Sequence, residues 1–159
     1  MAITLKTPEQ IELARRAGRV VGRVLDHLGD MAAVGVCTRE LDAAAEQMCT
    51  EMGAQCLFKG VPGRGGAGPF PKSVCVSINE QVVHGIPSDR RIEEGDIVSL
   101  DFGVKLDGWC GDAAETFVVG DADEDVRRLV EVTRNSLAMA VQMVRQGGLW
   151  STIARALQD

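Results

Sequence analysis

Residues 97–119 read IVSLDFGVKLDGWCGDAAETFVV and predict an antiparallel β-hairpin. Apolar and polar side chains alternate along the first half, which is the pattern of a strand with one buried face. Residues 105–108 (KLDG) then supply a turn, with Asp-Gly as its strongest signal, and residues 109–119 form the second strand. The rest of the sequence is best understood by what it adds to this hairpin.

Two aspartates are expected to face each other across the hairpin. A turn centred between Leu106 and Asp107 places Asp101 directly opposite Asp112, because both residues are equally far from that centre. Their Cβ atoms would then lie roughly 5 Å apart on one face, where like charges destabilise the pair. Something must offset the repulsion between the two carboxylates.

Three arrangements could offset it. The carboxylates could point apart into solvent, share one proton, or hold one or two divalent cations between them. Their face otherwise carries small residues, namely Ser99, Gly103 and Ala114. The opposite face is apolar and carries Phe102, Val104, Trp109 and Phe117. This contrast favours a sheltered polar site over a solvated one, and of the three arrangements we favour the cations.

The composition is that of an ordinary globular protein. A chain of 159 residues with 45% apolar and 25% charged residues is expected to form one domain with a real core. The net charge of −6, with 17 basic residues in no long run, argues against a nucleic-acid surface. No stretch resembles a membrane span, and the N-terminus lacks the apolar centre of a signal peptide. Five cysteines without a CxxC spacing predict reduced thiols in a cytoplasm, and neither a disulfide framework nor a zinc knuckle.

Helices are predicted before the hairpin. The first spans residues 7–28 and begins with a capping box made by Thr7 and Gln10. The second is expected to begin with Thr38 as its cap and to stop at Gly53. Each of these helices carries one apolar face.

Helices are also predicted after the hairpin. An acidic turn at 120–124 caps a third helix, which stops at the glycine pair 147–148. Residues 149–159 then start a further amphipathic helix, within which the sequence ends. Eleven residues form a stable helix only with packing partners.

A loop rich in glycine and proline is predicted at residues 59–72 (KGVPGRGGAGPFPK). It contains a literal GxGxxG, but Pro69 and Pro71 forbid the helix that a dinucleotide site requires after this pattern. We therefore reject the nucleotide interpretation. The loop is either a solvated excursion or the rim of a pocket, and Phe70, an apolar group fixed between the two prolines, favours the rim.

Two short strands are predicted between this loop and the hairpin, at residues 73–78 and 81–87. His84 stands near the end of the second one. Taken alone, such a histidine is more often structural than catalytic, and only its surroundings can change that balance. The other histidine, His27, lies near the end of the first helix. A histidine at this position is more often a charge at the helix C-terminus or a partly packed residue than a ligand.

Three stretches together resemble the type I methionine aminopeptidases. They are TPEQIELARRAG at 7–18, FPKSVCVSINEQVVHGIP at 70–87 and GDIVSLDFGVKLDGWCGDAAETFVVG at 95–120, and the similarity continues from residue 3 to the end. The resemblance implies the pita-bread fold, in which two pseudo-symmetric α/β halves surround a dimetal centre. Residues 1–159 would then be a single partial catalytic domain, equivalent to the first half, with an antiparallel sheet covered by helices.

The resemblance also implies roles for individual residues. Asp112 would bridge two divalent metal ions (Co, Mn, Fe or Zn), and Asp101 would bind one of them. His84 would be the catalytic histidine that hydrogen-bonds the substrate near the scissile bond. Phe70 and Cys75 would line the pocket for the N-terminal methionine side chain. The implied reaction removes the initiator methionine from a nascent polypeptide with a small second residue, near the ribosome in the cytoplasm.

The same resemblance implies that the ligand set is incomplete within these residues. The family's remaining ligands, one His and two Glu, belong to its second half, and a symmetric dimer would only bring Asp101 and Asp112 together again. We therefore expect such a dimer to bind metal loosely and to hydrolyse nothing. The alternative is an inactive half-domain that serves as a peptide-binding or assembly module. A proline-specific peptidase of the same fold fits less well, because the stretch at 70–87 is closer to the methionine enzymes.

Overall fold

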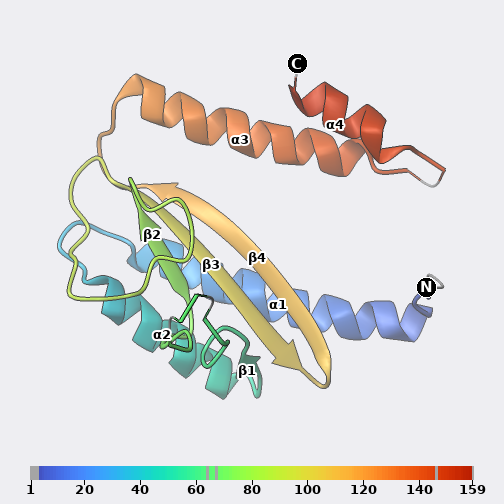
Figure 1. The fold of residues 1–159 in the computed structure, drawn as a ribbon, viewed down its shortest axis with the longest axis horizontal. Helices are drawn as coiled ribbons and strands as arrows, with labels where there is room; N and C mark the ends of the chain where they lie inside the picture. Colours follow the sequence, from blue (N-terminus) through green and yellow to red (C-terminus); the bar gives the residue numbers. More distant parts are fainter. Residues whose placement is uncertain (1–3, 64, 67, 146, 159) are drawn as a thin grey trace. The chain divides into compact units, whose positions relative to one another are not determined.

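The structure, a computed structural model, describes residues 4–63, 65–66, 68–145 and 147–158 (Figure 1). The chain divides into two units, Met1–Asp121 and Ala122–Asp159, each with its own internal packing. The first contains, in chain order, α1 (Pro8–Met31), α2 (Thr38–Glu51), β1 (Gln55–Cys56), β2 (Cys75–Ile78), β3 (Ile97–Leu106) and β4 (Trp109–Val118). The second contains α3 (Glu124–Met143) and α4 (Trp150–Gln158).

One antiparallel sheet organises the first unit. Strand β3 is its centre, because β4 pairs with β3 along its whole length while β1 and β2 pair with different parts of its other edge. The predicted hairpin is therefore confirmed. The predicted strand at 73–78 is confirmed in its second part as β2, whose residues are buried on both faces.

The hairpin turn has two residues. Leu106 pairs with Trp109, so Asp107 and Gly108 form the turn, with φ of 49° and 84°. Positive φ at both central positions is the requirement of a type I′ turn, which Asp-Gly satisfies well. The centre of the turn therefore lies between Asp107 and Gly108, one residue later than predicted.

This later turn changes the pairing of the two aspartates. Asp101 lies opposite Ala114, and Asp112 lies opposite Gly103. The prediction that the aspartates face each other directly is wrong. They share one face of the sheet, as predicted, but they are diagonal neighbours, a spacing at which Cα atoms lie about 7–8 Å apart.

The other face of the hairpin forms the core against α1. In Figure 1, α1 runs behind β3 and β4, and it contacts both strands. The approach is close, since a Cβ added to Gly111 of β4 would lie 2.7 Å from the carbonyl carbon of Ala17 in α1. The buried core side chains of this layer include Val21, Val24, Leu28, Val98, Leu100, Phe102 and Val104. The predicted capping box of Thr7 and Gln10 is present at the start of α1, which continues to Met31.

Helix α2 begins differently from the prediction. Cys37 occupies the cap position, and the Glu40 carboxylate accepts a hydrogen bond of 2.7 Å from the Cys37 N–H. Thr38 is the first helical residue, and its hydroxyl accepts from the Ser88 N–H at 2.8 Å, so its predicted role as cap is wrong. The predicted stop is confirmed, because Gly53 follows the helix with a φ of 68°.

The second unit is a pair of helices in contact with each other. Ala140 of α3 and Ile153 of α4 are its buried apolar residues among those described. Both predicted helices are confirmed, although α3 ends at Met143, before the glycine pair. Within the described parts of the chain, no helix is both long and apolar enough to cross a membrane.

Candidate functional site

Two carboxylates occupy the face of the hairpin that α1 leaves open. Asp101 is half-buried in the middle of β3, and Asp112 is exposed on β4. The pKa of Asp101 is raised by burial and, to a smaller extent, by the Asp112 carboxylate, whereas the nearby His84 lowers it. Asp101, Asp112 and His84 are therefore close enough to interact electrostatically.

Cys75 adjoins the carboxylates from β2. It pairs with Asp101 across the β2–β3 ladder, and it is buried. Burial, followed by the charges of Asp101 and Asp112, raises the pKa of the Cys75 thiol to about 12. A thiol in this environment stays protonated at neutral pH, so it offers a polarisable, nearly apolar wall.

A pinned loop presents His84. The strand predicted at residues 81–87 is not formed, because His84 has a φ of 58° and interrupts the extended chain. Gly85 instead anchors the loop to β2: its N–H donates to Ser77 Oγ at 3.0 Å, and its carbonyl accepts from the Val76 N–H at 3.0 Å. A Cβ on Gly85 would lie 2.1 Å from the Val76 carbonyl oxygen, so only glycine fits at this position.

Phe58 is a residue of this site that the sequence did not indicate. A Cβ added to Gly103 would lie 2.9 Å from Phe58 Cε1 and 3.1 Å from Asp112 Oδ2. The Phe58 ring and the Asp112 carboxylate therefore both lie over Gly103, on the same face of the sheet. The Leu57 N–H donates to the Gly103 carbonyl at 2.9 Å and holds this segment against β3. The only sequence signal was Gly103 itself, whose missing side chain leaves room for a ring.

Phe70 lies at the base of the glycine-rich loop. Its N–H donates to the Val61 carbonyl and its carbonyl accepts from the Gly60 N–H, both at 2.8 Å, so the end of the loop is tied to its beginning. The Phe70 side chain is half-buried, and its place in a methionine pocket stays a prediction. No helix follows the GxGxxG pattern, which agrees with the rejected nucleotide interpretation, although residues 64 and 67 lie outside the described residues.

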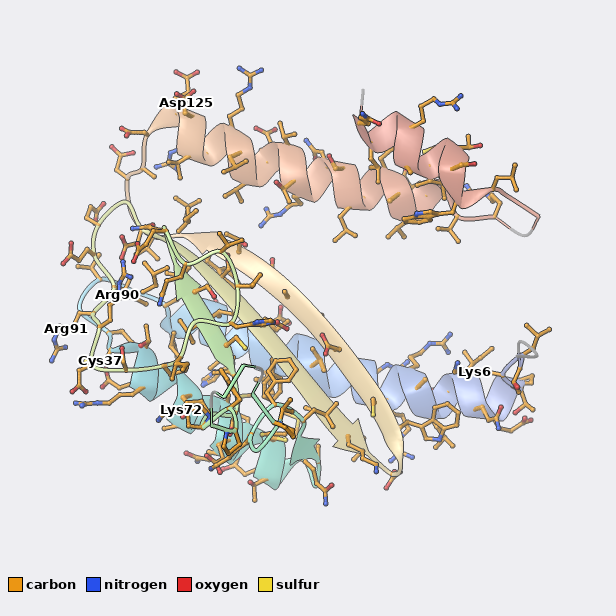
Figure 2. The ribbon with its side chains drawn as sticks, viewed as in Figure 1. Lys6, Cys37, Lys72, Arg90, Arg91 and Asp125 are labelled. Carbon is orange, nitrogen blue, oxygen red and sulfur yellow. The ribbon has the colours of Figure 1, made fainter. Side chains whose placement is uncertain are left out.

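Ion pairs fix both ends of the same loop to α2. Lys59 pairs with Glu46 at 2.6 Å, and Lys72 pairs with Asp42 at 3.2 Å. Figure 2 labels Lys72 beside α2, where the chain enters β2. Asp42 is buried and also accepts from the Ser73 N–H at 2.7 Å. The loop is therefore closed and anchored just before Cys75.

The carboxylates suit a hard cation. Among the described residues, neither Asp101 nor Asp112 has a Lys or Arg ion pair, so no such cation offsets their mutual repulsion. Carboxylate oxygens are typical ligands of divalent cations. Within the same described part of the chain, no group of three or more His, Cys, Asp or Glu side chains could hold a metal ion. The residues present thus fit one side of a metal site.

Comparison with known proteins also indicates a metal-dependent site. The sequence profile of metallopeptidase family M24 matches residues 12–159. Methionine aminopeptidase 1 of Bacillus subtilis (strain 168) is 41% identical over 156 residues, which cover 98% of this chain and 60% of that protein. The crystal structure of methionine aminopeptidase from Thermotoga maritima matches with a TM-score of 0.83 at 35% identity, over 91% of this chain and 56% of the other.

A peptidase named for proline matches less well. Prolidase from Pyrococcus furiosus has a TM-score of 0.71 at 25% identity, over 86% of this chain and 37% of the other. The chain spans about 60% of the length of the Bacillus relative.

Proposed function

The chain belongs to metallopeptidase family M24, and we propose that it forms the Asp101–Asp112 side of a metal-dependent methionyl aminopeptidase site. The observation that carries the proposal is the unneutralised carboxylate pair on the open face of β3 and β4. The similarity to proteins named methionine aminopeptidase supports the choice of reaction.

Asp101 and Asp112 would hold two divalent ions, Co, Mn, Fe or Zn, with Asp112 between them. Such ions supply Lewis-acid polarisation of the scissile carbonyl and activation of water. Because Asp101 has a raised pKa, it binds a proton more readily than an ordinary aspartate, and that proton must leave before a cation can bind. We therefore expect cation uptake to strengthen as the pH rises through the pKa of Asp101.

The remaining residues would bind and orient the peptide. His84, exposed on its pinned loop, would hydrogen-bond the substrate near the scissile bond. The protonated Cys75 thiol, together with Phe70, would contact the thioether of an N-terminal methionine. The Phe58 ring beside Asp112 would exclude water from one side of the carboxylate. The substrate is then the N-terminus of a nascent polypeptide with a small second residue, met near the ribosome in the cytoplasm.

One observation favours a second candidate, a peptide-binding module without turnover. No third protein ligand joins the two carboxylates among the described residues. The resemblance to the methionine aminopeptidases implies that the further ligands are a histidine and two glutamates. A chain with this ligand set would bind a methionyl peptide and a cation without hydrolysing the peptide.

Paramagnetic NMR tests the proposal. With Mn²⁺ bound to the chain, the methyl signal of Met-Ala-Ser should broaden, whereas that of Ala-Ala-Ser should not. The broadening should disappear in Asp101→Asn and Asp112→Asn, and it should persist in Asp107→Asn, which changes a carboxylate in the same hairpin that pairs with Arg16. Equal broadening of both peptides, or none, contradicts methionine recognition. Release of free methionine in the same tube would favour the enzyme over the binding module.

A further inference from the structure

Two cysteines outside the carboxylate site lie against each other. Cys49 is in the last turn of α2, and Cys56 is in β1, with the reversal at Gly53 between them. The Ala54 N–H donates to the Cys49 carbonyl at 2.9 Å, which folds the chain back onto the end of the helix. The end of α2 contacts β1, Cys56 packs against the core cluster that contains Cys49, and Cys56 contributes to the raised pKa of the Cys49 thiol; both cysteines are free.

The two thiols differ in access to solvent. Cys49 is 1% exposed and belongs to the core, and burial raises the pKa of its thiol to about 12. Cys56 is half-buried. An oxidant dissolved in water therefore reaches Cys56 first, and Cys49 is placed to react with the oxidised product.

Cys56 is also joined to the carboxylate site by a short stretch of backbone. It pairs with Val104 of β3, and Leu57 then donates to the Gly103 carbonyl. Two residues after Cys56, the Phe58 ring lies over Gly103 beside the Asp112 carboxylate. A displacement of β1 therefore moves that ring.

We propose that Cys49 and Cys56 form a reversible intrachain disulfide, and that its formation shifts the Phe58 ring relative to Asp112. The inference does not depend on the proposed function, because the cysteines lie outside the carboxylate site. A disulfide brings the sulfurs to about 2.05 Å, closer than any two thiols that are not bonded, so β1 must be drawn toward α2.

The oxidant named here is hydrogen peroxide. The Cys56 sulfur attacks one peroxide oxygen, the O–O bond breaks, and one water leaves after proton transfer, which gives a sulfenic acid. The Cys49 thiol then loses its proton, a step that its raised pKa makes slow at neutral pH; its sulfur attacks the Cys56 sulfur, the S–O bond breaks, and a second water leaves. Two thiols and one peroxide thus give one disulfide and two waters, and a small dithiol reverses the reaction.

Mass spectrometry tests the first part. Trypsin releases residues 40–59 as one peptide that contains both cysteines and no internal Lys or Arg. The exposed Cys110 is first replaced by serine to prevent bonds between chains. After one equivalent of peroxide, this peptide should lose two hydrogens (about 2 Da) and take up no iodoacetamide, and dithiothreitol should restore both thiols. Alkylation of both cysteines after oxidation, or sulfinic acid accumulating on Cys56, would overturn the proposal.

NMR tests the second part. The chain has four phenylalanines, so ¹³C-labelling of their rings gives few signals, and Phe58→Leu identifies those of Phe58. Oxidation should shift the Phe58 signals more than those of Phe117. Cys56→Ser should abolish the shift, and because Cys56 is half-buried this variant is expected to fold even where Cys49→Ser does not. Unchanged Phe58 signals in a chain with a verified disulfide would refute the link to the carboxylate site.

Discussion

Asp112→Asn should stabilise the metal-free chain. Asp112 is exposed, and its carboxylate raises the pKa of the half-buried Asp101. Replacing the carboxylate with an amide of similar shape removes the repulsion and leaves the backbone pairing with Gly103 in place. A residue that we assign to cation binding thus destabilises the fold in the absence of cation.

The size of the effect follows from the register. Diagonal neighbours have side chains about 6–7 Å apart, and at that distance two unit charges repel by about 0.6 kcal/mol in water and about 2.5 kcal/mol at an effective dielectric constant of 20. The exposure of Asp112 and screening by salt favour the lower figure. We therefore expect Asp112→Asn to raise the free energy of unfolding at pH 7 by about 0.5–1 kcal/mol.

The pH dependence of stability provides a second test of the direction of this effect. Because the pKa of Asp101 is raised on folding, the folded chain binds the proton more tightly than the unfolded chain does. Stability therefore falls as the pH rises from the ordinary value of 3.8 through the raised value, and it stays lower above it. The gain from Asp112→Asn should be full at pH 7 and should vanish at a pH well below 3.8, where Asp101 is protonated in both the folded and the unfolded chain.

Urea unfolding with a chelator present measures this gain. In a Trp150→Phe background, fluorescence reports Trp109 alone, which packs against the core of the first unit. Asp107→Asn serves as the matched control, because it removes a carboxylate that pairs with Arg16 at 3.0 Å and should have no effect or slightly reduce stability. A loss of stability in Asp112→Asn, or a gain that does not change with pH, would refute the reasoning.

The remaining predictions concern the anchors of the site. Gly85→Ala should lower the free energy of unfolding by about 2 kcal/mol or more, because the new Cβ would lie 2.1 Å from the Val76 carbonyl oxygen; a change below about 0.5 kcal/mol in urea unfolding would contradict this close contact. Lys72→Met should cost about 1–2 kcal/mol, since it leaves the buried Asp42 carboxylate without its cation, whereas Lys59→Met removes an exposed pair and should cost less than about 0.5 kcal/mol. Equal losses in the two lysine variants would show that burial of the partner does not decide the cost.

The sequence predicted most where a pattern repeats over many residues. The hairpin at 97–119 and the long helices have strong periodicity, and the expected antiparallel sheet covered by helices is observed. The resemblance to methionine aminopeptidases, and with it the pita-bread type of fold, is confirmed by the comparisons. Asp101, Asp112, His84 and Cys75 lie close enough to interact electrostatically, although the direct pairing of the two aspartates was wrong, and the roles of these residues stay predictions.

The errors arose where backbone conformation at one or two residues decides the outcome. The sequence KLDG at residues 105–108 is compatible with two positions of the turn centre, and the positive φ of both Asp107 and Gly108 selects the later one. Residues 81–87 carry a strand-like composition, but the left-handed His84 breaks the extended chain. Strand β1 has two residues and no periodicity, so neither it nor Phe58 could be found from the sequence pattern.

Calorimetric titration of the chain with Mn²⁺ or Co²⁺ tests the central claim most directly. We predict heat of cation binding for the parent chain and for Asp107→Asn, a large loss in Asp101→Asn and in Asp112→Asn, and none in the double variant of Asp101 and Asp112. Equal heats in the parent and the double variant, or no uptake by the folded parent chain at a pH above the pKa of Asp101, would contradict the claim that these two carboxylates share a face in order to hold cations.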